Sequence, residues 1–271
     1  MPELPEVETT RLGLASYVIG RCVAAVVVRN PRLRQPVPAE LATELPGQVV
    51  KTLERRGKYL LLGTELGTVL LHLGMSGNLR ILSEAKPADP HDHVDIIFSD
   101  GSLLRFHDPR RFGLVLWIRT NPLDHPLLCD LGPEPLGLQF TGEYLYQRSR
   151  RRSVAVKAFL MDQRVVVGVG NIYVAESLFL AGIHPARAAG SIESDQYERL
   201  VAAVRKVLQT AIVQGGTTLR DFYDSSGRAG YFQLSLQVYG RAGEPCCRCH
   251  RPIDSSRLLQ RSTFYCAHCQ R

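Results

Sequence analysis

The hydrophobic pattern of the chain changes between Asn121 and Gly142. This stretch holds four prolines (122, 126, 133 and 135) and three glycines, residues that interrupt helices and strands. Before it, apolar residues recur at the spacing of strands, and after it they recur at the spacing of helices. The chain has 271 residues, more than one compact core usually needs. We therefore expect two domains with their boundary in this stretch.

The part before this boundary predicts one helix followed by many short strands. Glu6–Ile19 has the pattern of an amphipathic helix, with Val7, Leu14 and Val18 on one side. The turn sequence Ser99–Ser102 separates two of the strands. Short strands with regular turn signals predict an antiparallel sandwich or barrel, with the helix along its edge. The predicted strands are Cys22–Val28, Val49–Leu53, Tyr59–Leu62, Val69–Leu73, Leu79–Leu82, Val94–Phe98, Leu103–Phe106 and Leu114–Ile118.

Three helices are predicted beyond the boundary, at Glu143–Ser153, Ile172–Leu180 and Tyr197–Gln214. Asp195 followed by Glu198 has the spacing of a capping box for the third helix. This second part of the chain is therefore expected to be helical up to its cysteine-rich tail.

The tail carries two C-x2-C units separated by sixteen residues. Four thiolates with this spacing are typical of a closed, tetrahedral zinc site, whose role is structural because no coordination position stays open. Free buried cysteines are the alternative. Cys247 is an additional cysteine, and His250 and His268 are less suitably spaced competitors. The predicted ligands of the single zinc ion are Cys246, Cys249, Cys266 and Cys269.

The charge balance favours a polyanionic partner. The chain has 33 Lys+Arg against 26 Asp+Glu, a formal net charge of +7. Only five of these basic residues are lysines, and the rest are arginines. Arginine binds phosphate through two parallel hydrogen bonds, although genomic base composition could also produce this bias. The sequence has neither an apolar run of about 20 residues, as a membrane span requires, nor a signal-peptide pattern. We expect a cytoplasmic protein with no membrane association, whose cysteines are reduced or bind metal.

Basic residues concentrate in Gln147–Arg152, which is either a nucleic-acid contact or a solvated helix face. Gly168–Asn171 precedes a predicted helix, and a helix N-terminus capped by Asn171 is a phosphate-binding arrangement, although the segment could equally be a tight turn. Met75 between glycines and Phe112 after two arginines are of the type that wedges between base pairs. Such residues more often belong to a core.

The N-terminus offers a nucleophile. If Met1 is trimmed, Pro2 becomes a free secondary amine, and α-amino groups titrate near ~7.7–8.0. An unprotonated amine can attack an electrophilic carbon and form an iminium (Schiff-base) intermediate, with Glu3 and Glu6 as candidate proton carriers. An ordinary helix start is the alternative, because Pro5 suits a first helical turn.

Taken together, the motifs of this chain resemble those of the formamidopyrimidine-DNA glycosylase family. They occur in the same order, and the resemblance covers the full length of the chain. The ordered set is much more specific than any single motif. The motifs are Pro2–Glu6, Arg56–Leu60 with Lys58, His72–Gly77, Asp108–Gly113, Gly168–Tyr173, Gly215–Thr218, Gln237–Arg241 and the four-cysteine finger with Thr263–Cys266. His250, at a position where the family often has glycine, and the added Cys247 are small departures.

The resemblance implies an α+β multidomain fold with DNA in the cleft between domains. A β-sandwich with its leading helix would span residues 1–130, a helix–two-turns–helix domain 131–236 and a zinc finger 237–271. It also implies a monomeric base-excision repair enzyme acting on damaged double-stranded DNA. Such an enzyme excises oxidised purines (8-oxoguanine and formamidopyrimidines) and then cleaves the abasic strand by β,δ-elimination, as both glycosylase and lyase.

The resemblance also assigns roles. Pro2 resembles the nucleophile that attacks C1′, Glu3 the proton donor for the sugar and glycosylic step, and Glu6 a residue that positions the lesion. Lys58 matches the proton donor in β-elimination, and Arg261 the residue assigned to δ-elimination and to phosphate binding. Met75, Arg110 and Phe112 resemble the trio that fills the gap left by the everted nucleotide, and 217–231 the loop over the flipped base. The expected DNA contacts are His72, Met75, His91, Arg110, Phe112, Arg152, Lys157, Asn171 and Tyr239.

Two alternatives remain. An endonuclease VIII-like glycosylase for oxidised pyrimidines would share the fold and the Pro2 chemistry, but Leu4 and the complete Met75, Arg110 and Phe112 set argue against it. A zinc-containing DNA-binding protein without chemistry would use Pro2 only to start a helix. The joint presence of the predicted catalytic residues argues against that alternative.

Overall fold

The structure is a computed structural model that describes residues 2–84, 86–216 and 236–271. Its backbone contacts divide the chain into two compact units. One unit extends to Cys129 and also takes in Gln214 and the two glycines after it. The other holds Asp130–Val213 and the described residues from Leu236 onward. The three domains expected from the sequence, at 1–130, 131–236 and 237–271, stay a prediction.

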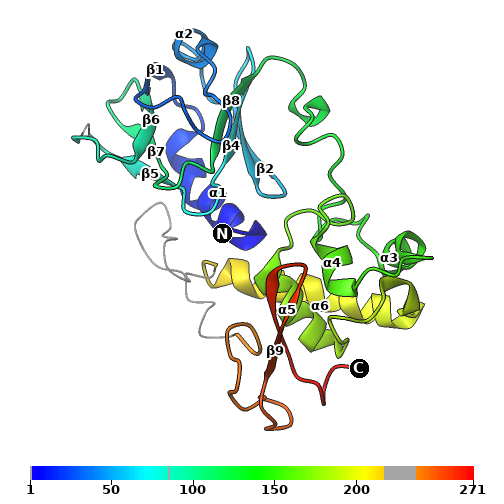
Figure 1. Ribbon diagram of the computed structural model, residues 1–271. Coiled ribbons are helices and arrows are strands. Elements are labelled where there is room, and N and C mark those ends of the chain that lie inside the picture. The colour runs from blue at the N-terminus through cyan, green and yellow to red at the C-terminus, as the bar shows by residue number, and fades with distance from the viewer. Residues whose placement is uncertain (1, 85, 217–235) are drawn as a thin grey trace. The chain divides into compact units, whose positions relative to one another are not determined.

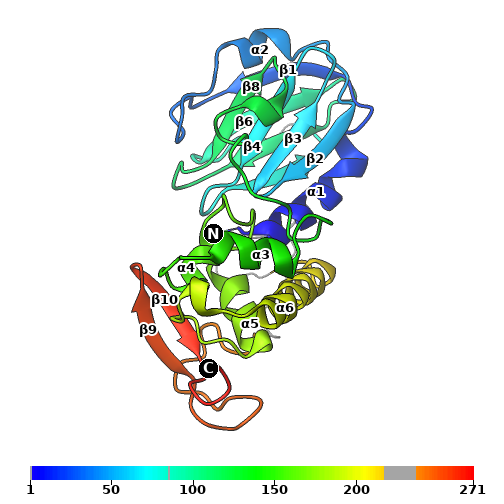
Figure 2. The ribbon, with the colours of Figure 1, turned by 90° about the vertical axis from the view of Figure 1, so that its right-hand side faces the viewer.

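The first unit is a sandwich of two antiparallel four-stranded sheets, which Figure 2 shows layered face to face. One sheet has the order β1-β6-β7-β5 and the other β2-β3-β4-β8. The strands are β1 Val23–Val28, β2 Thr52–Arg56, β3 Tyr59–Gly63, β4 Thr68–His72, β5 Asn78–Leu82, β6 Asp92–Phe98, β7 Leu103–His107 and β8 Leu114–Ile118. The predicted sandwich with a leading helix is confirmed.

The leading helix, α1 (Leu4–Val18), begins earlier than the periodicity indicates. Pro5 lies in its first turn, where the missing N–H breaks no intrahelical bond. The helix contributes Val7, Leu14 and Val18 to the core between the sheets, so its apolar side is the one predicted. The chain start is thereby held against a packed core.

Strand β2 lies three residues beyond its predicted start at Val49. It pairs with β3 up to Arg56 opposite Tyr59, so a two-residue turn at Gly57 and Lys58 determines where it ends. The short helix α2 (Glu40–Glu44) was not predicted, because its five residues are too few to show a period. The 3-10 turn η1 (Pro122–Asp124) follows the last strand of the sandwich.

The second unit is helical, with a hairpin near its end (Figure 1). Its α5 is buried along most of its length, and Gly182 ends it in the left-handed conformation with φ 73°. Unpredicted elements are α4, the 3-10 turn η2 and the hairpin strands β9 and β10. The elements are α3 Gly142–Ser149, α4 Val156–Met161, α5 Asn171–Ala181, η2 Ala189–Ser191, α6 Ser194–Val213, β9 Asp254–Leu258 and β10 Arg261–Tyr265.

Two helix ends differ from prediction for tertiary or local reasons. Helix α3 ends at Ser149 instead of Ser153, because the backbone of its C-cap Arg150 leaves the helical conformation, with ψ 137°. The Arg150 guanidinium donates to the Tyr146 carbonyl at 3.1 Å and to the Ile192 carbonyl at 2.8 Å. Helix α6 begins at Ser194, so the capping box predicted for Asp195 and Glu198 is wrong. Instead, Gln196 Oε1 accepts from the Glu193 N–H at 3.1 Å, while Asp195 pairs with Arg199.

Among the described residues, none of the helices combines the length and apolar character that crossing a membrane requires.

Candidate active site and metal centre

The chain start places two carboxylates in a buried position. Pro2 is buried, and the side chains of Glu3 and Glu6 belong to residues that are 3% and 2% exposed. Glu6 Oε2 accepts a hydrogen bond from the Glu3 N–H at 2.7 Å, as a helix-capping carboxylate does. The helix start and the proposed chemistry are therefore compatible, because the capping bond leaves the Pro2 nitrogen uninvolved.

Gly216 lies directly against Glu6. A Cβ at this glycine would come within 3.0 Å of Glu6 Oε1, and its φ of +80° disfavours any other residue. The backbone thus approaches the buried carboxylate more closely than a side chain would allow. The segment expected to cover the flipped base, 217–231, lies outside the described residues.

Lys58 occupies the second position of the β2–β3 turn and is 4% exposed. The turn is braced by Arg55, whose guanidinium donates to the Gly57 carbonyl at 3.0 Å and to Glu8 Oε2 at 2.9 Å. Burial of Glu8 opposes its ionisation, but hydrogen bonds from Arg11 and Arg55 outweigh burial and lower its pKa. The ion pair between Glu8 and Arg55 therefore joins helix α1 to the turn that carries Lys58.

His72, at the end of β4, is a buried neutral imidazole. Burial, and secondarily the positive charges of Lys58 and Arg34, lower its pKa from 6.5 to about 4. Its Nδ1 accepts the Gly74 N–H at 2.9 Å, which leaves the proton on Nε2. At neutral pH this side chain is therefore a hydrogen-bond donor without charge.

Three exposed side chains sit on two neighbouring turns of the sandwich. Met75 is 39% exposed and Phe112 46% exposed. The Arg110 guanidinium carbon lies 5.1 Å from the centre of the Phe112 ring. His91, nearby in the same unit, is also exposed. The alternative that Met75 and Phe112 belong to a core is wrong.

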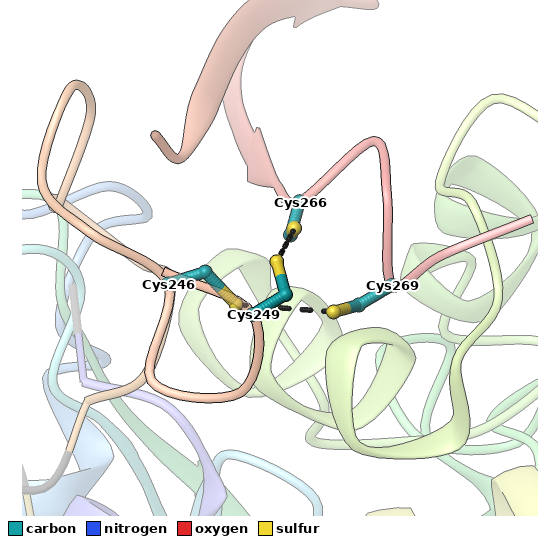
Figure 3. A group of neighbouring side chains, drawn as sticks. All are labelled: Cys246, Cys249, Cys266 and Cys269. Carbon is teal, nitrogen blue, oxygen red and sulfur yellow. Dashed lines mark hydrogen bonds between the residues drawn. The ribbon is translucent and has the colours of Figure 1, made fainter. Parts of the chain in front are cut away.

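The four predicted cysteine ligands converge in the second unit (Figure 3). Their sulfurs all lie within 4.8 Å of one another. The Cys246–Cys269 and Cys249–Cys266 sulfur pairs are 3.9 and 3.5 Å apart. A tetrahedron with Zn–S bonds of about 2.3 Å has sulfurs about 3.8 Å apart, so the cluster fits a metal ion of this kind. Among the described residues it is the single such group.

The predicted competitors lie apart from this cluster. Cys247 is exposed and its sulfur lies 3.6 Å from Gln237 Oε1. His250 adopts a left-handed φ of 60° in the loop after Cys249. That conformation explains why glycine suits this position, since a side chain there is strained.

Lys157 and Asn171 bind the hairpin of the finger to the helices at Ser262 and Thr263. Lys157 Nζ donates to the Ser262 carbonyl at 2.9 Å and to Thr263 Oγ1 at 2.7 Å. Asn171 Nδ2 donates to the same carbonyl at 3.1 Å. Arg261, adjacent in sequence, is exposed on β10. The prediction that Asn171 caps α5 is wrong, because Gly170 occupies the cap and Asn171 is the first helical residue.

Glu176 anchors the segment that leads into the finger. Its carboxylate accepts the backbone N–H groups of Gln237, Val238 and Tyr239 at 2.8–3.0 Å. The Tyr239 ring then packs edge-on against Phe264 at 5.1 Å. Burial raises the pKa of Glu176, although these three donors act in the opposite sense.

The basic run Gln147–Arg152, which begins in the last turn of α3 and continues beyond it, is not a uniform solvated helix face. The Arg150 guanidinium lies 3.9 Å from the Tyr146 ring centre and binds the Ile192 carbonyl of the same unit. Arg151 takes a left-handed φ of 61°, and Arg152 is exposed with its N–H bonded to the Ser149 carbonyl at 3.0 Å. The run therefore supplies separate cations at a turn.

Residues 1–115 match the family model described as the formamidopyrimidine-DNA glycosylase N-terminal domain, and residues 131–223 match that of the formamidopyrimidine-DNA glycosylase H2TH domain. The chain belongs to the formamidopyrimidine-DNA glycosylase family. The expected resemblance, the DNA glycosylase class and the fold class are thereby confirmed.

Relatives and solved structures match this chain over nearly its whole length. The formamidopyrimidine-DNA glycosylase of Acidithiobacillus ferrooxidans is 59% identical over 100% of both chains. The MutM (Fpg) protein from Thermus thermophilus is 39% identical, with a TM-score of 0.89 over 99% of this chain and 98% of that one. The Lactococcus lactis Fpg in complex with abasic-site DNA is 34% identical, with a TM-score of 0.91 over 99% of both chains. A Lactococcus lactis Fpg mutant was solved with DNA containing Fapy-dG, again at 34% identity and over 99% of both chains, with a TM-score of 0.92.

Within this glycosylase chain, sequence reasoning missed the residues that hold the site together. Arg55, Glu8 and Glu176 carry no motif of their own, and their partners are distant in sequence. Asp108 was recognised as part of a motif without any assigned role. The available signal was a charged residue within or close to a motif, as Arg55 and Asp108 are; Glu176 offered instead the signal of a carboxylate in an otherwise apolar helix.

Proposed function

We propose that the chain excises oxidised purines from duplex DNA through a Pro2 Schiff base and then cleaves the abasic strand by β,δ-elimination. The observation that carries the proposal is the chain start, where Pro2 adjoins two carboxylates held out of water in the first turn of α1. The family's own structures with Fapy-dG and abasic-site DNA support this substrate class.

The residues divide the chemistry as follows. Glu3 donates a proton in the sugar and glycosylic step while the Pro2 nitrogen attacks C1′ and the damaged base departs. The burial of Glu3 supports this role, because it places the carboxyl directly beside Pro2 and away from bulk water. Glu6, against Gly216, positions the lesion.

Strand cleavage follows on the iminium. Loss of a C2′ proton expels the 3′ phosphate (β-elimination), and a further elimination expels the 5′ phosphate. Lys58 serves as the proton donor in the first elimination, and the exposed Arg261 serves in the second while it binds a phosphate. The turn between β2 and β3 buries Lys58 close to the neutral His72, and this placement supports its assignment to the site.

Binding precedes the chemistry and is largely indifferent to sequence. A base inside the duplex is out of reach of Pro2, so the nucleotide is everted while Met75, Arg110 and Phe112 support the vacated stack. Phosphate contacts come from the basic surface, including Arg152 and the finger. The remaining DNA contacts are His72, His91, Lys157, Asn171 and Tyr239.

The metal at the four cysteines is one structural zinc ion, which holds the finger together. Four thiolates complete its tetrahedron, so the ion takes no part in the reaction. The protein acts as a cytoplasmic monomer on damaged double-stranded DNA.

Borohydride trapping tests this function. Wild-type protein with Met1 removed should form a trapped covalent complex with 8-oxoguanine duplex and should cut it. Retaining Met1 converts the Pro2 nitrogen into an amide without nucleophilic character, and trapping should disappear. Intact mass identifies which form is present. Glu3→Gln keeps the amine, so it should lose base release yet still cut a preformed abasic site in part.

Two outcomes contradict the proposal. Trapping by the Met1-retaining form would move the nucleophile to another amine, with Lys58 the first to test. Trapping on oxidised pyrimidine duplex in preference to 8-oxoguanine would assign the chain to the pyrimidine-specific class.

A further inference from the structure

Asp108 is a fully buried carboxylate that follows β7 and lies outside the proposed chemistry. Its Oδ1 accepts from Ser76 Oγ at 2.9 Å and from the Arg110 N–H at 3.3 Å. Its Oδ2 accepts from the Gly113 N–H at 2.8 Å. Burial of a carboxylate is costly unless its oxygens are satisfied, and here the donors that satisfy them come from two separate turns.

The backbone of Asp108 binds further segments. Its carbonyl accepts from His93 Nε2 at 2.8 Å and from the Arg111 N–H at 3.2 Å. Its own N–H donates to the His91 carbonyl at 2.9 Å. One residue therefore links the start of β6, the turn after β7 and the turn between β4 and β5.

The two turns carry the exposed side chains that, in the proposed function, fill the gap left in the DNA stack by the everted nucleotide. The two turns touch: a Cβ at Gly74, whose φ is +64°, would lie 2.5 Å from the Phe112 carbonyl carbon. Met75 follows this glycine directly. Because β4 ends at His72 and β7 ends at His107, neither turn has sheet pairing to hold it in place.

We propose that Asp108 is a positioning residue that holds the Met75 turn and the Arg110–Phe112 turn in one rigid wedge. The proposal rests on the proposed function. An apolar wedge separates stacked bases only if its parts keep their relative placement while the stack resists. Side chains on unbraced turns would have to be ordered at that moment, at a cost in binding free energy. Asp108 removes that cost before DNA arrives.

The test compares Ser76→Ala, Asp108→Asn and the double variant under single-turnover conditions. Each acts on two duplexes, one with paired 8-oxoguanine and one with a preformed abasic site. Ser76→Ala should slow excision of the paired lesion roughly 10-fold, since it removes a hydrogen bond to a charged group. Cleavage at the abasic site, where less unstacking is needed, should change by less than about 2-fold. Asp108→Asn should slow excision of the paired lesion more than Ser76→Ala does. The groups that face both Asp108 oxygens are donors, so the amide nitrogen of asparagine would face one of them without forming a hydrogen bond.

A thermodynamic cycle separates positioning from general weakening. If Ser76 acts through Asp108, the double variant should be no slower than Asp108→Asn alone. A 2-aminopurine base opposite the lesion should report slower unstacking in the same variants. Leu104→Ala, a core change within β7 and outside the sequence of both turns, serves as the control for lost stability and should not separate the two substrates.

Distinct results overturn distinct claims. Equal losses on both duplexes, additive effects in the cycle, or no loss at all would refute the positioning role of Asp108. If Phe112→Ala also affects both duplexes equally, the wedge itself is refuted, and with it this proposal. If the wild-type protein fails to excise 8-oxoguanine, the proposed function fails first.

Discussion

The ammonium of Lys157 donates to Oγ1 of Thr263 at 2.7 Å, across 106 residues of sequence. Lys157 is 2% exposed and also donates to the Ser262 carbonyl, so it joins α4 to the hairpin of the finger. The proposed DNA contact by Lys157 and this structural contact make different predictions.

Lys157→Met should loosen the finger from the helices and lower the free energy of unfolding by about 1–3 kcal/mol, because it removes two hydrogen bonds of an ammonium and leaves the buried Thr263 Oγ1 without this donor. Thermal unfolding and protease sensitivity of the finger measure this loss. Lys206→Met makes the same chemical change at an exposed position and should be neutral. Weaker DNA binding with unchanged unfolding would instead identify Lys157 as a direct phosphate contact.

His72 should remain neutral well below pH 6.5. Its folded pKa of about 4 lies below the unfolded value, so the unfolded chain gains a proton first as the pH falls. The stability contributed by His72 is therefore present above pH 6.5 and lost between that pH and about 4. Nitrogen-15 NMR of the imidazole measures the titration directly. Lys58→Met should raise this pKa only part of the way, because burial is the larger cause; titration of the unmodified protein near 6.5 would contradict the geometry.

Removal of the metal should unfold the finger and spare the sandwich. Cys249→Ser deletes one of four ligands, and metal binding supplies the folding free energy of a module this small. Metal content by mass spectrometry should fall, and duplex affinity should fall with it. The Cys247→Ser control should retain both, because Cys247 lies outside the cluster. If the metal-free protein kept its full affinity for duplex DNA, the finger would not contribute to DNA binding.

Substitution of His250 by glycine should stabilise the finger. At φ 60° a side chain costs roughly 1–2 kcal/mol relative to glycine, so the gain should be up to about 1 kcal/mol after the added flexibility of the unfolded chain is subtracted. The midpoint of metal release under a competing chelator measures the change. An unchanged or earlier release would show that the His250 side chain makes a compensating contact.

Arg152 should contribute to the salt dependence of binding. Each phosphate contact adds about 0.9 to the slope of log affinity against log salt for duplex DNA. Arg152→Ala should make that slope shallower by about one, with little dependence on DNA sequence. Arg150→Ala should behave differently and destabilise the helical unit, because its guanidinium is bound to the Ile192 carbonyl. A slope that Arg152→Ala leaves unchanged would remove this residue from the phosphate contacts.

Much of the fold follows from local patterns. The strands of the sandwich alternate or repeat apolar residues over five to seven positions, and their pairing follows once turns such as Phe98–Ser102 are recognised. The four metal ligands were predictable for the same reason, since tetrahedral geometry places two closely spaced pairs together regardless of the remaining chain. Helix α1 likewise follows from periodicity and Pro5.

Tertiary contacts decided the rest. The Arg150 guanidinium donates to a carbonyl on a distant turn, and Arg55 joins the Lys58 turn to Glu8 on the neighbouring helix. Neither partner is close in sequence. Asp108 is part of a motif, yet its function as a hub exists only where two turns meet around one buried carboxylate. Residue type and spacing determine which chemical groups the chain carries. The burial of these groups and their partners depend on packing between segments far apart in sequence. Burial and partners in turn decide the protonation state and the position of each group.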